Sequence, residues 1–160
     1  CTPIRFLTTT TIEKIGIYTF VPYTGADATY RLGLYETNTS GNELKPGVLL
    51  ADAGTLTLSN PTSVGIQELT FSTPVVLTAD TLYWMVCAHT NTTIPFTAQC
   101  SGNIAPAAST GLEITTNYFS SAAVGYRYAA AGATALLDPF VVDATIRTSA
   151  LTPLVFLKVA

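Results

Sequence analysis

Short extended segments separated by turns follow one another closely between residues 30 and 87 of this chain. In residues 30–37, Tyr30, Leu32 and Leu34 occupy alternate positions. Similar segments follow at residues 48–51, 56–58, 69–71 and 82–88, with Gly, Pro, Asn or Asp between them. Apolar side chains at every second position are typical of β-strands, and strands joined by short turns pair antiparallel. This series therefore favours antiparallel β structure over any helical fold.

The rest of the chain has the same character, and no segment keeps a 3.6-residue period. We predict an all-β fold, an antiparallel β-sandwich and specifically a jelly roll. Its 160 residues suit one domain over residues 1–160, without an internal repeat or linker. Because the chain begins with Cys1, we expect it to be part of a longer protein or to be processed from one.

Three local features make this prediction specific. In residues 12–21, Ile15, Ile17 and Val21 share one face of the expected strand. The tripeptides at residues 52–54 and 78–80 read as turns. Residues 82–88 are apolar at odd and even positions alike, which predicts a strand covered on both sides, with Trp84 anchored in the core through a bonded N–H.

The composition limits the possible partners. Only 11% of the residues are charged, against roughly 25% in ordinary soluble domains, and the mean hydropathy is +0.40. No apolar run approaches the about 18 residues of a membrane span, so we expect apolar surface to be buried in a homo-oligomer instead. The net charge is −3 and the seven basic residues are scattered, which argues against nucleic-acid binding.

Catalytic and metal-binding patterns are missing from the sequence. The single His, His89, would need Asp52 or Asp80 from a turn to form a relay with a Ser, and a structural or solvent-exposed His is the favoured interpretation. Paired acids could converge in space for glycosidase chemistry, but most acids fall in turns or on polar strand faces. Asp52 or Asp80 could also contribute to a calcium site, without a supporting motif. We predict no enzymatic activity, no cofactor and no metal.

Cys1, Cys87 and Cys100 leave two interpretations open. Cys87 and Cys100 could form a disulfide if their strands pair. The favoured interpretation is that the cysteines are isolated, buried thiols.

An aromatic cluster is the best candidate for ligand contact. It consists of Tyr118, Phe119, Tyr126, Arg127 and Tyr128. Flat rings stack on sugar faces and a guanidinium donates to hydroxyl groups, so the combination suits a carbohydrate. The favoured alternative is that these side chains fill the core or a subunit interface, where aromatic residues are also enriched.

Several short motifs together resemble a domain of bacteriophage tail and fibre proteins. They are the segments at residues 15–17, 31–35, 46–50, 52–54, 77–86 and 153–159, including Arg31-Leu32-Gly33-Leu34-Tyr35 and Tyr83-Trp84-Met85-Val86. The resemblance extends over nearly the whole chain as spaced motifs. Their Gly and Pro positions set turns and their aromatic residues fill a core.

This resemblance implies a non-enzymatic virion protein on the outer surface of a tail or fibre. We expect a homotrimer that contacts other virion proteins and attaches to host-surface glycans. One alternative is a purely structural decoration module of a capsid or tail. Another is a carbohydrate-binding module of a secreted bacterial enzyme, which would be extracellular.

Overall fold

The computed structural model of the chain describes residues 2–19, 28–40, 45–58, 65–89, 99–100, 135–140, 152–153 and 155–160. These residues form strands and connections, and none of them is helical. The strands are β1 (Thr2–Arg5), β2 (Thr10–Thr19), β3 (Ala28–Asn38), β4 (Lys45–Leu58), β5 (Gly65–Leu77), β6 (Leu82–His89), β7 (Gln99–Cys100), β8 (Thr152–Pro153) and β9 (Val155–Val159).

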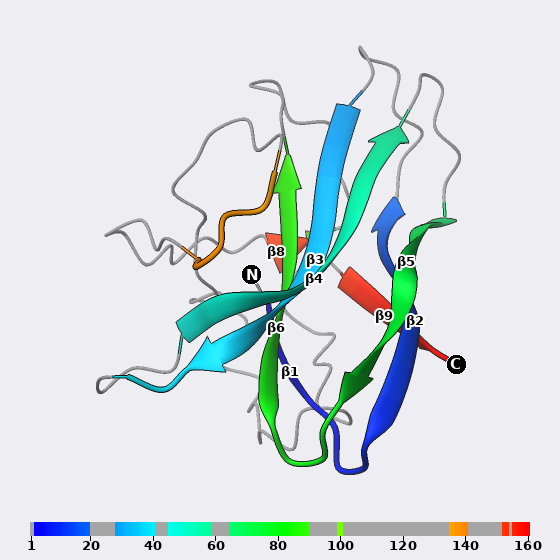
Figure 1. The fold of residues 1–160 in the computed structure, drawn as a ribbon. Coiled ribbons are helices and arrows are strands. Elements are labelled where there is room, and N and C mark those ends of the chain that lie inside the picture. Colours follow the sequence, from blue (N-terminus) through cyan, green and yellow to red (C-terminus); the bar gives the residue numbers. More distant parts are fainter. Residues whose placement is uncertain are drawn as a thin grey trace.

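Two antiparallel sheets pack face to face as a β-sandwich, which confirms the predicted fold class (Figure 1). Sheet A has the strand order β1-β6-β3-β4, and sheet B has the order β5-β2-β9. β7 and β8 form a separate two-stranded pair.

The pairing of the first six strands is nested. β1 pairs with β6, β2 with β5, and β3 with β4, all antiparallel. A jelly roll also pairs its strands in nested order but uses eight of them. The described strands do not establish that complete topology, so the jelly roll stays a prediction.

Two of the chain's crossings between the sheets lie at the same end of the sandwich (Figure 1). One crossing joins β1 to β2 through residues 6–9, and the other joins β5 to β6 through residues 78–81. The Asp80 N–H donates to the Phe6 carbonyl at 2.8 Å, and the Ala79 N–H donates to Thr9 Oγ1 at 3.2 Å. The second crossing contains the predicted turn, and Asp80 holds it with φ = 56°, a conformation that Asp tolerates better than most residues.

The main core lies between the two sheets. Its fully buried side chains include Ile12, Ile15, Ile17, Leu32 and Leu34. The prediction that Ile15 and Ile17 share a face is confirmed, whereas Val21 lies outside the described residues. Ile12 is three positions before Ile15 and would point outward in a regular strand. A β-bulge between Ile12 and Lys14 turns both isoleucines inward.

The predicted turn at residues 52–54 is wrong, because β4 continues through it. Opposite Leu32 and Gly33 of β3 stand Gly54 and Asp52, so Ala53 is an extra residue in the ladder. Gly54 has φ = +91°, a conformation that only glycine adopts readily. An Asp-Ala-Gly sequence suits a tight turn and a bulge equally, and the long pairing with β3 selects the bulge.

β6 is covered on both sides, as its sequence predicts. Tyr83 and Met85 belong to the core between the sheets. Trp84, Val86 and Ala88 lie on the other face of sheet A and form a second cluster with Leu136 and Phe140. Residues 135–140, which we call the strap, thus cover part of the outer face of sheet A. Trp84 is 3% exposed and its Nε1–H donates to Thr37 Oγ1 at 3.0 Å, so the predicted anchoring of this residue is confirmed.

Candidate functional site

The five predicted ligand-contact residues, Tyr118, Phe119, Tyr126, Arg127 and Tyr128, all lie outside the described residues. Their grouping therefore stays a prediction. The backbone of His89 is described at the end of β6, where it faces Tyr30 of β3 in the strand register. Its side chain is not among those described.

Asp52 is held by an ion pair with Arg31 on the neighbouring strand. Arg31 Nη2 lies 2.7 Å from Asp52 Oδ2, and Arg31 Nε lies 2.9 Å from the same oxygen. Asp52 Oδ1 also accepts a hydrogen bond from the Gly54 N–H at 2.8 Å. Both side chains are about three-quarters buried, at 23% and 24% exposure. These contacts assign Asp52 to fixing the bulge, so its carboxylate is already committed.

Asp80, the other acid considered for a relay or a calcium site, is an exposed residue of the turn between β5 and β6. Across the described ranges, no group of three or more His, Cys, Asp or Glu side chains could hold a metal ion.

Cys87 is a free cysteine, which answers the question left open by the sequence. The residue faces Leu32 in the register of β3 and β6 and packs against the main core. Burial raises the pKa of the Cys87 thiol from 9.0 to about 12. At neutral pH this thiol is protonated and therefore a poor nucleophile.

A shallow hollow lies on the outer face of sheet B, the face turned away from sheet A. It has a volume of about 320 Å³ and is half open to solvent. Its walls include Ile66 of β5 and Val159 of β9, which are 53% and 51% exposed. Its charged rim consists of Lys14, Glu68 and Lys158.

Gly16 of β2 forms part of this hollow because it has no side chain to fill it. A Cβ built at Gly16 would lie 2.6 Å from the carbonyl oxygen of Gln67 on β5, so a larger residue does not fit without movement of the strand. Lys14 Nζ lies 2.9 Å from Glu68 Oε2 beside it. The hollow thus places aliphatic side chains next to mixed charge.

Sequence reasoning missed this hollow. Its one local signal is Gly16 between Ile15 and Ile17, an absent side chain on the face opposite the isoleucines. Lys14 and Ile15 precede Gly16 on β2, but the other lining residues come from β5 and β9, and only the tertiary structure brings these strands to either side of β2.

Comparisons with known proteins gave no match: no family model fits the chain, and no curated protein or solved structure matches it. The described residues contain no helix long and apolar enough to cross a membrane.

Proposed function

We propose that this protein is a non-enzymatic β-sandwich domain of a bacteriophage virion, placed on the outer surface of a tail or fibre. It attaches to host-surface glycans as a homotrimer and contacts other virion proteins through its remaining surface. The observation that carries this proposal is the set of motifs resembling phage tail and fibre proteins, found on a chain of very low charge and high hydropathy.

The positions of those motifs in the fold support the proposal. Residues 31–35 lie in β3, residues 46–50 and 52–54 lie in β4, and residues 77–86 include the crossing from β5 to β6. Leu32, Leu34 and Tyr35 are completely buried. Motifs that build the strands of a sandwich place no restriction on the sequences of the connecting loops. Ligand contacts of rigid β scaffolds are commonly made by such loops.

The aromatic cluster is the proposed glycan contact. Stacking of Tyr126 and Tyr128 on sugar rings, with Arg127 donating to hydroxyl groups, would give weak binding at each site. Three copies facing one bacterial surface would multiply this affinity through effective concentration.

A glycan array probed with the fluorescently labelled oligomer tests the proposal. We expect binding to a small set of bacterial surface glycans, and loss of that signal in a Tyr126→Ala/Tyr128→Ala variant. Leu7→Ala is the matched control, because Leu7 is 66% exposed in the connection between β1 and β2. Its signal should equal that of the unmodified protein.

An array without signal, together with no adsorption of the labelled oligomer to host cells, would contradict glycan attachment. The purely structural alternative predicts that result, and it also predicts labelling along the shell or tube when the intact parent particle is imaged with a gold-tagged antibody. Labelling at the fibre tip would support attachment.

A further inference from the structure

The outer faces of the two sheets differ in what covers them. The strap packs on the outer face of sheet A, where Leu136 and Phe140 are buried against Trp84. On the outer face of sheet B, by contrast, Ile66 and Val76 of β5 remain 53% and 57% exposed. These two side chains are therefore open to a neighbour, whereas Ile12, Ile15 and Ile17 of the same sheet are buried in the chain's own core.

The charges of this face balance each other. Glu13 and Lys14 of β2, Glu68 of β5 and Lys158 of β9 contribute two negative and two positive charges. Such a face has no net attraction for a nucleic acid, an acidic glycan or an anionic membrane. A charge-balanced, partly aliphatic face is instead compatible with a protein surface of the same kind.

Two of these four charges are already paired within the chain, and two are not. Lys14 and Glu68 form the ion pair of 2.9 Å beside the hollow. Glu13 and Lys158 have no ion-pair partner within 4.0 Å in the described part of the chain. Glu13 is the extra residue of the bulge opposite Lys158 and Val159, and it directly precedes Lys14 of the hollow's rim.

One unpaired carboxylate and one unpaired ammonium on the same face make that face complementary to another copy of itself. Each contact between copies can join Lys158 of one protomer to Glu13 of the next, and the exposed aliphatic side chains then cover one another. The same ion pair repeats at every contact of a closed ring, whether the ring contains two copies or three.

We propose that the outer face of sheet B is the surface through which copies of this chain associate, with Lys158 of one protomer bound to Glu13 of its neighbour. This inference rests on the homo-oligomer of the proposed function and identifies the surface that forms it. The oligomer buries Ile66 and Val76 and fills the hollow beside Gly16.

Charge reversal tests the proposal. Glu13→Lys and Lys158→Glu each place like charges across the contact, and we expect each to weaken association by about tenfold or more in sedimentation velocity experiments over a concentration series. The double variant Glu13→Lys/Lys158→Glu restores opposite charges and should return the dissociation constant to within a few-fold of the original.

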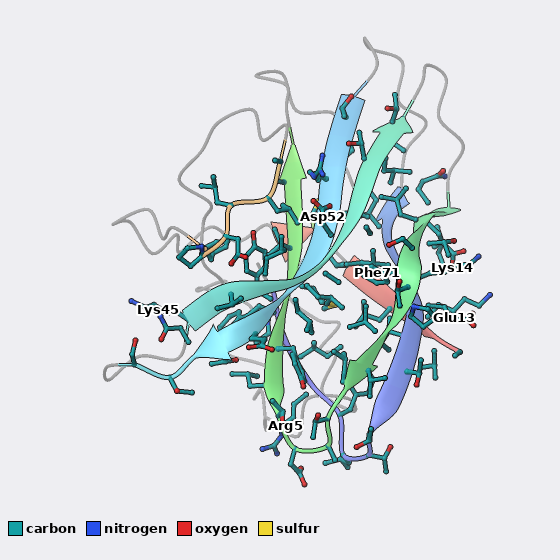
Figure 2. All side chains as sticks on the ribbon, in the orientation of Figure 1. Arg5, Glu13, Lys14, Lys45, Asp52 and Phe71 are labelled. Atoms are coloured by element: carbon teal, nitrogen blue, oxygen red, sulfur yellow. The ribbon has the colours of Figure 1, made fainter. Side chains whose placement is uncertain are left out.

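Lys45→Glu and Glu36→Lys are matched controls with the same charge changes. Figure 2 shows Lys45 on the side of the molecule away from Glu13 and Lys14, and Glu36 is an exposed residue of β3. Both controls should associate like the unmodified protein. Ile66→Asp changes the aliphatic part of the face and should also weaken association, while circular dichroism confirms that each variant is folded.

Several outcomes would overturn the proposal, and they separate it from the proposed function. If every variant keeps the original oligomer, this surface is wrong although the oligomer stands. If the unmodified protein is a monomer at all concentrations, the oligomer itself is wrong. If the reversals change only the thermal unfolding of the dilute monomer, Glu13 and Lys158 pair within one chain and the surface is again wrong.

Discussion

The identity of a single residue is most tightly constrained where two backbones, or a backbone and the strap, lie in close contact. At Gly33 of β3, a Cβ would lie 2.3 Å from Leu136 Cδ1 of the strap and 2.7 Å from the Ala51 carbonyl oxygen of β4. Both distances are shorter than a carbon atom allows. Gly33 therefore admits the strap on one side of the sheet and keeps the ladder with β4 intact.

Gly33→Ala should lower the free energy of unfolding by about 1–3 kcal/mol, as overpacking of a core does. Chemical denaturation with urea measures this change. Leu136→Ala removes one of the two clashing groups, so the double variant should lose less stability than the two single variants added together. Strict additivity would show that Leu136 does not contact the position of Gly33.

The thiol of Cys87 makes stability depend on pH in the alkaline range. Its pKa is raised to about 12 by burial, whereas an exposed thiol has a pKa of 9.0. Between these two values the unfolded chain has lost the proton and the folded chain has kept it. The contribution of Cys87 to stability is therefore constant below about pH 9 and falls as the pH rises toward 12.

Comparison with Cys87→Ala isolates this effect from the other groups that titrate at high pH. The difference in free energy of unfolding between the two proteins should be constant from pH 7 to about 9 and should shrink above it. A difference that stays level to pH 11 would mean that the thiol is hydrated in the folded state.

At the scale of elements, the strap is the feature that the sequence pattern indicates least. Residues 135–140 have no strand pairing, but they are tied to sheet A by backbone and side-chain contacts. The Tyr35 hydroxyl donates to the Leu137 carbonyl at 2.7 Å, and the Phe140 N–H donates to the Gly47 carbonyl at 2.8 Å. The Tyr35 and Phe140 rings meet edge to face with centroids 5.2 Å apart. These contacts keep Trp84 out of water.

Phe140→Ala should release the strap and cost about 3 kcal/mol of stability, the lower end for a buried phenylalanine. Trp84 is the single tryptophan of the chain, so its fluorescence reports on the strap directly. We expect the emission maximum of the folded variant to shift to longer wavelength.

Phe71→Ala is the control for that measurement. Phe71 is 4% exposed in the core between the sheets, in the inter-sheet region where Figure 2 labels it. Its loss should reduce stability by a similar amount without shifting the emission of the folded protein. Equal emission maxima in the two variants would contradict a shielding role for the strap.

At the scale of the whole molecule, the nested strand order places sequence-distant segments side by side. Ile4 of β1 faces Tyr83 of β6, and Ile17 of β2 faces both Gln67 of β5 and Val155 of β9. Both sheets depend on such distant pairs, so their loop-closure entropy must be overcome before the core between them forms.

We therefore expect refolding on the millisecond-to-second timescale, as in other β-sandwiches. Stopped-flow recording of Trp84 fluorescence after dilution from urea measures it. A slower phase whose rate rises with protein concentration would report association of the folded copies. Complete refolding within microseconds would contradict the dependence on distant pairs.

Alternation with a period of two is a local property that burial on one side imposes, so the sequence was enough to predict the strands and their faces. It was sufficient for the sandwich, for the two covered faces of β6 and for the anchoring of Trp84. The turn predicted at residues 52–54 is wrong because the local chemistry of Asp-Ala-Gly permits both a turn and a bulge. Only the pairing with β3 distinguishes them.

The way in which distant segments meet follows only from the three-dimensional fold. The strap on sheet A, the commitment of Asp52 to Arg31, and the hollow between β5, β2 and β9 each join residues far apart in the chain. No local pattern encodes such contacts, since they depend on the order of strands within the sheets. That order is set by which arrangement buries the most apolar surface while pairing the backbone, a property of the whole chain.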